Sequence, residues 1–303
     1  MPSVEIRFKP AQTFSGHAAA VYAIASGRSA STFFSASGDR FVTEWNVDTG
    51  EQEAFAVKLE QPAFSLCYVK SVNLLFVGNS IGGIHVIDLA EKKEIRYLVQ
   101  HTNGIYDMVF DAPRNQLIVA GGDGVMSVWS LPDLQLLVAL PLITEKLRQL
   151  TFNAAQTSLA IASGDGGIRL LDPLFFNEIS LTTLHPEGAT SVSFHPTKSV
   201  ILSGGKDAML RIHSLENHAE LFAIPAHNFA IYSIAFNPSG TLFATASRDK
   251  TIKIWNATTL DLIERLDHKS GGHSHSVNKL LWMNEHVFLS CSDDRKIIQW
   301  SAN

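Results

Sequence analysis

The chain has very little cysteine: Cys67 and Cys291 are the only two in 303 residues. Small secreted scaffolds held by disulfides are rich in cysteine, so that class is excluded. A disulfide between these two residues is not expected, because in a closed ring of repeats a whole repeat would separate them. We expect both side chains to be small buried apolar groups in a reducing, cytoplasmic compartment.

Long apolar runs and an excess of positive charge are also missing. No segment approaches the roughly 18 continuous apolar residues of a membrane-spanning helix, and the first ten residues lack the apolar stretch of a secretory signal. The net charge is −5, from 24 Lys and Arg against 29 Asp and Glu. Nucleic-acid binding draws much of its affinity from neutralised phosphates, so an acidic chain without a basic stripe is a poor candidate. We expect no membrane and no direct nucleic-acid partner.

What the sequence does have is a period of 42 residues. Six positions stand 42 apart, and a seventh follows after 45: Asp39, Ile81, Asp123, Asp165, Asp207, Asp249 and Asp294. The residue six positions after each member is often Trp, and the residue 22 before it (21 before the last) is usually His. Such a period indicates a repeat architecture, in which each unit buries its face against its neighbours. Seven units account for nearly the whole chain, so we expect a single domain over residues 1–303.

Repeat six shows the expected secondary structure most clearly. Strands are predicted at residues 231–236, 241–246, 251–255 and 260–266, with the turn Asn237-Pro-Ser-Gly240 after the first. Short strands at even spacing with turn signals between them indicate an all-β sandwich, barrel or propeller. Four strands in each of seven repeats favour a seven-bladed β-propeller with four-stranded antiparallel blades.

The ends of the chain also predict how the ring closes. The sequence stops just after Trp300, in the third strand of repeat seven, so the last blade lacks a fourth strand. Residues 6–8 and 11–14 offer a strand before His17. We expect this N-terminal strand to complete the last blade and remove its exposed edge.

Four side chains recur together in repeats one, six and seven. The sets are His17, Ser35, Asp39 and Trp45; His227, Thr245, Asp249 and Trp255; and His273, Ser290, Asp294 and Trp300. A buried carboxylate is costly without donors, which the His supplies; the hydroxyl bridges onward, and the indole N–H needs an acceptor of its own. Because the set repeats and no Gly-x-Ser-x-Gly turn presents a nucleophile, we interpret it as a structural network and expect no catalytic residues.

With these residues the sequence resembles the WD-repeat family over nearly its whole length. Gly16-His17 and Gly272-His273 match its Gly-His signature, and Ile87-Asp88 and Leu171-Asp172 match its Trp-Asp signature in degenerate form. Several repeats depart from the pattern. Repeat two lacks His, Asp and Trp; repeat four keeps only Asp165; repeat three has Val119 at the hydroxyl position; and repeat five has His213 for Trp. We expect those blades to rely on packing, and repeats two to four to be softer than six, seven and one.

One irregular stretch, Asp267 to His275, holds three histidines and an aspartate. Such a cluster is a candidate metal site. His273 already has a structural role, however, and no Cys or Glu completes a well-spaced set of ligands. We interpret the stretch as a flexible surface loop without metal. The glycine pairs of the chain fall in β-turns and not between a strand and a helix, so no phosphate-binding loop and no cofactor are expected.

The resemblance implies a partner site on the face that carries the His and Asp loops, where the family commonly receives peptide segments. The positions concerned lie three and five residues after the His and one before the Asp. There we expect partner binding by Tyr22, Phe64, Tyr106, Arg148, Lys206, Tyr232 and Arg248. Aromatic residues fall in blades one to three, and Lys146, Arg148, Lys206 and Arg248 gather on the opposite arc. Tyr and Arg are typical of binding hot spots.

The expected function is a non-catalytic protein–protein interaction platform, monomeric when alone. It would hold an extended peptide with an apolar anchor over blades one to three and an acidic group over blades four to six. A plainer interpretation is that the aromatic side chains only plug the channel mouth. Two further alternatives are an accessory subunit of an RNA- or chromatin-handling complex, and a propeller enzyme with a metal-dependent channel site. The enzyme would need carboxylates, His or Asn around the channel, and the rim positions offer only Asp293.

Overall fold

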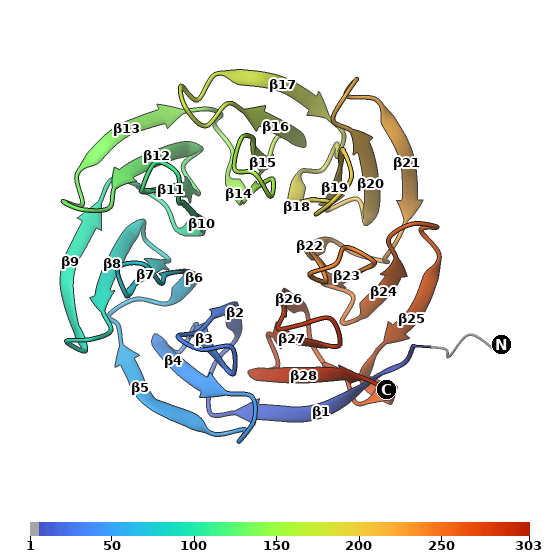
Figure 1. The fold of residues 1–303 in the computed structure, drawn as a ribbon, viewed down its shortest axis with the longest axis horizontal. Coiled ribbons are helices and arrows are strands. Elements are labelled where there is room, and N and C mark those ends of the chain that lie inside the picture. The colour runs from blue at the N-terminus through green and yellow to red at the C-terminus, as the bar shows by residue number, and fades with distance from the viewer. Residues whose placement is uncertain (1–5) are drawn as a thin grey trace.

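The computed structural model describes residues 6–303 and shows seven sheets arranged around a central axis (Figure 1). Each sheet has four strands, and every pair of neighbouring strands is antiparallel. The strands of a blade follow one another outward from the centre of the ring (Figure 1). The predicted seven-bladed β-propeller is confirmed.

The blades are built from consecutive strands. Blade one contains β2 (Val21–Ser26), β3 (Thr32–Ser37), β4 (Phe41–Asn46) and β5 (Gln52–Lys58). Blade two contains β6 (Ala63–Val69), β7 (Leu74–Asn79), β8 (Gly83–Asp88) and β9 (Lys93–Val99). Blade three contains β10 (Ile105–Asp111), β11 (Gln116–Gly121), β12 (Val125–Ser130) and β13 (Leu136–Pro141). Blade four contains β14 (Leu147–Phe152), β15 (Leu159–Ser163), β16 (Gly167–Leu171) and β17 (Glu178–Thr183).

The second half of the ring continues the pattern. Blade five contains β18 (Ala189–Phe194), β19 (Val200–Gly205), β20 (Met209–Ser214) and β21 (Glu220–Pro225). Blade six contains β22 (Ile231–Phe236), β23 (Leu242–Ser247), β24 (Ile252–Asn256) and β25 (Leu262–Leu266). Blade seven contains β26 (Val277–Trp282), β27 (Val287–Ser292), β28 (Lys296–Ala302) and β1 (Phe8–Ser15). Within residues 6–303 no helix is long and apolar enough to cross a membrane.

The two ends of the chain meet in blade seven. β1 pairs antiparallel with β28, from Phe8 opposite Ala302 to Ser15 opposite Lys296, with one irregularity in register near Pro10. Figure 1 shows β1 running along the outside of β28. The predicted closure by an N-terminal strand is confirmed, and the strand also brings the buried Phe8 into the core of the last blades.

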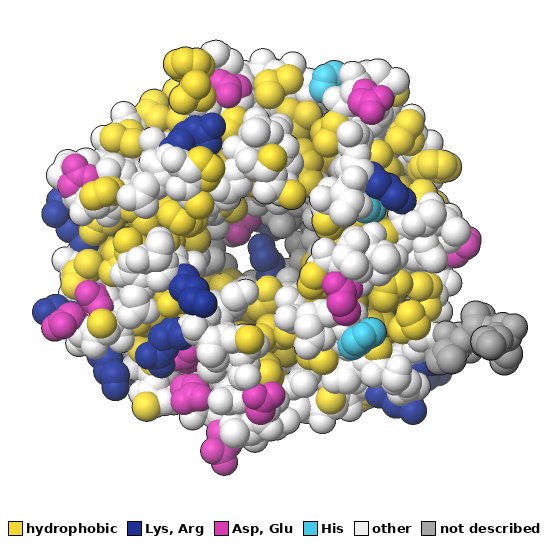
Figure 2. Space-filling view, in the orientation of Figure 1, with side chains coloured by type: hydrophobic (Ala, Val, Ile, Leu, Met, Phe, Trp, Pro, Cys, Tyr) yellow, Lys and Arg dark blue, Asp and Glu magenta, His cyan; other side chains and the backbone are white. Residues whose placement is uncertain are grey.

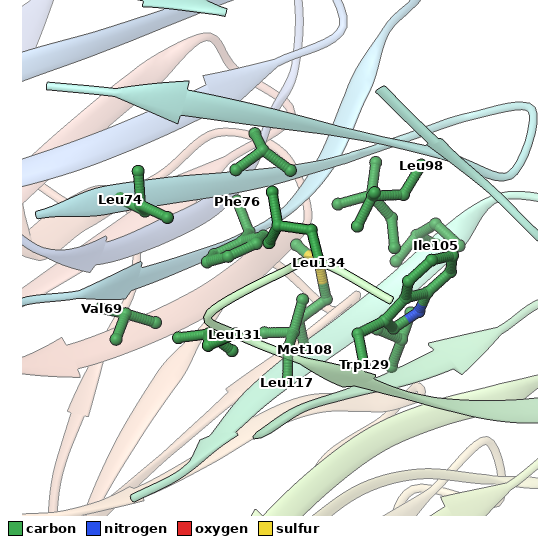
Figure 3. Close-up of a cluster of buried hydrophobic side chains, with 13 residues drawn as sticks. Val69, Leu74, Phe76, Leu98, Ile105, Met108, Leu117, Trp129, Leu131 and Leu134 are labelled. Atoms are coloured by element: carbon green, nitrogen blue, oxygen red, sulfur yellow. The ribbon is translucent and has the colours of Figure 1, made fainter. Parts of the chain in front are cut away.

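The apolar core lies between neighbouring blades. One cluster joins blades two and three, where Phe76 and Leu98 pack with Met108 and Trp129 (Figure 3). The second strands β3, β7, β15 and β23 are buried at every position, because both of their faces are covered by adjacent blades. Burial of apolar area contributes about 25 cal/mol per Å², so separating two blades would expose two apolar faces at once.

We predict that deleting residues 1–14 opens the ring. The deletion removes most of β1, exposes the edge of β28 and takes Phe8 and Phe14 out of the core. The melting temperature in a thermal scan should fall by well over 10 °C, or the protein should aggregate. Deleting residues 1–5 alone keeps β1 and serves as the control. Full thermal stability of the longer deletion would contradict the role given to β1.

Candidate functional site

A buried chain of hydrogen bonds links Trp45 to Asp39 in the first blade. The Trp45 indole N–H donates to the Ser35 hydroxyl over 2.8 Å. Ser35 Oγ lies 2.7 Å from His17 Nε2, and His17 Nδ1 lies 3.0 Å from Asp39 Oδ2. The same carboxylate oxygen accepts the Ala18 backbone N–H over 2.8 Å. The acceptor of the indole is therefore the hydroxyl of the same set, and not a separate group.

The chemistry of the groups sets the direction of each bond. An ionised carboxylate only accepts, so Nδ1 of His17 carries the hydrogen and Nε2 accepts the hydroxyl hydrogen of Ser35. The hydroxyl oxygen then accepts the indole N–H. Ser35 is 0% exposed, so a substrate cannot reach it. This arrangement of Ser, His and Asp ties the loop before the blade to its middle strands.

Blades six and seven repeat the arrangement. His227 Nδ1 lies 3.0 Å from Asp249 Oδ2, and His273 Nδ1 lies 3.0 Å from Asp294 Oδ2. The hydroxyl and indole positions are filled by Thr245 and Trp255 and by Ser290 and Trp300. Burial would raise the pKa of Asp294, but the hydrogen bond and charge of His273 and two backbone N–H groups lower it to about 2. Burial lowers the pKa of His227, which outweighs the opposing effect of Asp249.

The expectation that the degenerate blades rely on packing alone is wrong. In blade three, His101 Nδ1 lies 3.1 Å from Asp123, and His101 Nε2 lies 2.8 Å from Ser127 Oγ. Trp129 Nε1 donates to the same hydroxyl over 2.9 Å. Ser127 stands directly across the β11–β12 ladder from Val119. The hydroxyl that is missing at Val119 therefore reaches the network from the neighbouring strand.

In blades four and five, an arginine four residues after the aspartate binds its carboxylate. Arg169 Nη1 donates to Asp165 Oδ1 over 3.1 Å. Burial would raise the pKa of Asp165, but the hydrogen bonds of Arg169, Gly167 and Ser163 lower it to about 2. In blade five, Arg211 donates to Asp207 over 2.6 Å, beside the ordinary bond of that carboxylate to its His.

Blade two replaces the whole set. His85 Nδ1 lies 3.0 Å from Glu94 Oε2, and His85 Nε2 lies 3.3 Å from Asn79 Nδ2. The substitutes in blades two to five all stand four residues after the 42-residue series, at the positions Thr43, His85, Ser127, Arg169, Arg211, Lys253 and Ile298. Sequence reasoning missed this series. Its signal was present, since four of its seven members are polar groups in the four blades that lack part of the common set.

His213 is the exception, because it occupies the Trp position without a partner. Its side chain is 3% exposed, and neither ring nitrogen has a hydrogen-bond partner within residues 6–303. Burial, together with the nearby charges of His185 and Arg211, lowers its pKa from 6.5 to about 4. The folded protein therefore holds this histidine neutral at physiological pH.

Every inner strand of the ring carries a β-bulge at the same place. The bulged residues stand five positions after the His register: Tyr22, Phe64, Tyr106, Arg148, Thr190, Tyr232 and Asn278. A bulge leaves one residue out of the ladder and redirects its side chain. All seven of these residues line one cavity at the channel, of about 320 Å³. The repeat thus supplies seven unpaired positions whose residue type differs from blade to blade.

Three of these positions form an aromatic wall, which we define as Tyr22, Phe64 and Tyr106. The Tyr22 and Phe64 ring centroids lie 5.1 Å apart, edge to face, and those of Phe64 and Tyr106 lie 5.9 Å apart. Burial and the nearby Asp293 carboxylate raise the pKa of Tyr22, so its phenol keeps its hydrogen. Tyr22 is 37% exposed, which leaves its ring open to a partner.

The basic residues begin directly beside this wall and not across the channel from it, which corrects the predicted opposite arc. The Arg148 guanidinium lies 4.5 Å from the centre of the Tyr106 ring, and Lys146 Nζ donates to the Tyr106 hydroxyl over 2.9 Å. Lys206 and Arg248 lie in an adjoining hollow that shares Arg148 and Tyr232 with the channel cavity. The structure therefore brings all seven predicted partner-binding residues into two continuous hollows.

In blades two to six, the residue after the bulge links neighbouring blades. Ser65 Oγ donates to the Ile105 carbonyl over 2.9 Å, and Asp107 Oδ2 accepts the Leu150 N–H over 3.0 Å. Blades four to seven are linked by Gln149, Ser191 and Ser233, which bond to Val192, Ile231 and Leu280. In blade seven the bulged residue itself makes the link: the Asn278 side-chain amide donates to the Val21 carbonyl over 2.9 Å, which joins blade seven to blade one. At these positions the side chains hold the ring together.

One ion pair crosses the channel. Lys279 Nζ of blade seven lies 3.5 Å from Asp107 Oδ1 of blade three. Figure 2 shows basic and acidic side chains inside the central opening. Asp107, which is not one of the rim positions, therefore brings a carboxylate to the channel cavity in addition to Asp293. Asp107 is engaged by Lys279 and a backbone N–H, and within residues 6–303 no three His, Cys, Asp or Glu side chains form a group that could hold a metal ion.

The stretch from Asp267 to His275 contains an ordered turn. Residues His268–Ser270 form a short 3₁₀-helix, and the Asp267 side chain accepts the Lys269 N–H over 2.9 Å. Gly271 ends it with φ of 82°, a left-handed conformation that glycine adopts without strain. His273 belongs to the network of blade seven, so the three histidines do not converge on one point.

These features define a class: a closed propeller whose blades share a His–hydroxyl–Asp–Trp network and present variable residues at the channel. The sequence profile described as "WD domain, G-beta repeat" matches residues 8–46, 92–130, 178–214, 219–256 and 265–301. These segments cover more than half of the 303 residues, and the chain belongs to the WD40 family. The unmatched stretches fall in repeats two and four, which have lost the most signature residues.

Two curated relatives are similar over part of the chain. WD repeat-containing protein 55 of Pongo abelii is 25% identical over 115 residues, which cover 38% of this chain and 30% of that protein. The Rattus norvegicus protein of the same name is 26% identical over 95 residues, or 31% of this chain and 25% of that protein. Each match therefore spans less than a third of the relative.

We predict that Ser127→Ala destabilises blade three. The substitution leaves the buried His101 and Trp129 nitrogens without their shared partner, at a cost of about 1–3 kcal/mol in the free energy of unfolding. Adding Val119→Thr should recover much of this loss, because position 119 faces position 127 and other blades carry their hydroxyl there. Urea denaturation measures both variants. A Ser127→Ala protein as stable as the parent would show that the hydroxyl does not matter.

We predict that His213→Trp stabilises the protein, and more so in acid. The indole, which other blades carry at this position, would replace an unpartnered ring and donate to the Ser203 hydroxyl that already bonds to His185. The unfolded chain binds a proton near pH 6.5 but the folded one only near pH 4, so the parent loses stability as pH falls through this window. The loss is at most about 3 kcal/mol. Urea denaturation from pH 7 to 4 should show the gap between the two proteins widening; parallel profiles would contradict the assignment.

Proposed function

We propose that the chain is a non-catalytic protein-interaction platform that holds an extended peptide segment of a partner at its channel face. WD40 propellers are typically scaffolds for protein interactions and are generally non-catalytic. The observation that carries the proposal is the ring of seven bulges. The bulged residues stand outside the strand ladder, all seven side chains line one cavity, and five residue types occur among them.

The chemistry of the bulged positions favours a peptide with two kinds of side chain. The aromatic wall presents large, rigid, amphipathic rings of the sort that dominate binding energy at protein interfaces. Arg148 stands beside it with its guanidinium stacked on Tyr106. An apolar side chain of the partner fits against the wall, and an acidic group fits the basic residues next to it.

The packing of the rings favours an open site over a plug of the channel mouth. They contact one another side by side along blades one to three. No ring contact joins Tyr232, on the far side of the cavity, to this wall in the described part of the chain. A plug would bring rings together across the opening, whereas this arrangement keeps a cavity of about 320 Å³ between them.

We also propose that the platform works in the cytoplasm. Both cysteines are free, and burial raises the pKa of Cys67 to about 12, so it stays a protonated thiol. Unpaired, unreactive thiols fit a reducing compartment.

Replacing Tyr22, Phe64 and Tyr106 together with Ala should abolish partner capture. Tagged parent and variant would be compared by affinity purification and mass spectrometry, and proteins retained by the parent should fall at least tenfold. The double variant Leu174→Ala/Phe175→Ala is a matched control, because both residues are exposed and apolar but lie between β16 and β17. Circular dichroism and thermal unfolding check the fold of each variant. Equal capture by the folded triple variant would refute the proposed site.

A further inference from the structure

The hollow over blades three to six contains an unusual concentration of unpaired positive charge. It measures about 730 Å³, and its lining includes four cations and two carboxylates: Lys146, Arg148, Lys206, Arg248, Glu145 and Glu187. We call it the basic hollow. It shares Arg148, Thr190 and Tyr232 with the channel cavity, so one ligand can occupy both.

Three of the four cations of the basic hollow have no polar partner in the described part of the chain, whereas Lys146 donates to the Tyr106 hydroxyl. Within residues 6–303, the charged groups of Arg148, Lys206 and Arg248 make no hydrogen bond and no ion pair. Elsewhere the chain pairs guanidinium groups with carboxylates, as Arg114 does with Asp111 at 3.0 Å. The unpaired cations of the hollow are therefore available to a ligand.

The two arginines are also held in a geometry suited to an oxyanion. Arg148 lies 4.5 Å from the centre of the Tyr106 ring, and Arg248 lies 5.9 Å from the centre of the Phe229 ring. The closer contact, that of Arg148, holds its guanidinium against the ring, and a guanidinium can bind two oxygens of one anion at once through its N–H groups. The two arginines and two lysines carry four positive charges, and the two glutamates carry two negative charges. The basic hollow therefore has an excess of two positive charges.

The charge of the hollow selects among anions. A carboxylate carries one negative charge, whereas a phosphoryl group on a side chain carries roughly −1.5 to −2 at pH 7 and offers three acceptor oxygens. The excess of two positive charges matches the phosphoryl group. Glu145 and Glu187 lie among the cations and would repel a strand with a phosphate at every nucleotide, so a single phosphoryl group fits better than a nucleic acid.

We propose that the basic hollow binds a phosphoryl group on a serine, threonine or tyrosine side chain of the partner peptide, next to the segment that packs on the aromatic wall. This inference rests on the proposed function and names the chemistry of the partner. Binding would then depend on phosphorylation of the partner, so the platform would recognise only a modified form of it.

The test uses three matched arrays of synthetic peptides with random flanking residues and a fixed central phosphoserine, glutamate or serine. The full-length protein should bind phosphoserine peptides at least tenfold more tightly than glutamate or serine ones, and 10 mM inorganic phosphate should compete. Lys206→Ala/Arg248→Ala should remove this preference. Lys70→Ala/Lys93→Ala removes two exposed charges elsewhere and should keep it.

The other outcomes overturn the inference in distinguishable ways. If peptides bind through the aromatic wall with no preference for phosphoserine over glutamate, the interaction platform stands and the phosphoryl site fails. If no peptide binds on any array, both fail. If single-stranded RNA or vesicles containing phosphoinositide bind more tightly than the phosphopeptides, and Lys206→Ala/Arg248→Ala abolishes this, the hollow serves a different class of ligand.

Discussion

The closure of the ring by β1 is the constraint on which the rest of the structure depends. The matched repeat segments, such as residues 178–214, each run from the outer strand of one blade through three strands of the next. A chain built in this way must overlap its own ends to finish the last blade. Since the apolar clusters lie between blades and not within them, no blade has a complete core of its own. Closure of the ring therefore joins seven blades, none of which is complete alone, into one stable domain, as in other repeat architectures.

The buried networks show how a repeat can lose its signature and keep its structure. What each blade requires is a donor set for a buried carboxylate or amide at the tight turn before the third strand. The position four residues after the aspartate faces that turn from the third strand, so Ser127 and Arg169 can serve there in place of the usual hydroxyl or His. The requirement is physical, and several residue types meet it. At the Trp position of blade five, His213 has no such partner on either ring nitrogen within residues 6–303.

The period of the sequence was enough to predict the propeller, the strand count, the closure and the rim positions, because all of these follow from the register of a single repeat. The period was not enough to predict the role of Ser127, because that role depends on its position opposite Val119 in the β11–β12 hairpin. Nor did it reveal the pair of Asp107 and Lys279, which belong to blades that are not adjacent and meet only because the channel is narrow. The stacking of Arg148 on Tyr106 likewise depends on how closely two blades approach. Contacts between repeats depend on how the blades pack in three dimensions. The spacing of residues along the sequence does not contain that information.

In blades two, three, four and six, structure and binding are separated by one residue along the inner strand. The bulged residue, such as Tyr106 or Arg148, leaves the ladder and lines the cavity, while the following residue, such as Asp107 or Gln149, bonds to the backbone of the next blade. In a regular strand, successive side chains point to opposite faces of the sheet, so the orientation of each one is fixed by its place in the ladder. A bulge removes this constraint at one residue. In those blades the irregularity frees one position from the demands of the sheet, so the residue there can change with the partner while the ring stays intact. Thr190 and Asn278 are exceptions, because their side chains donate to backbone carbonyls of the neighbouring blades.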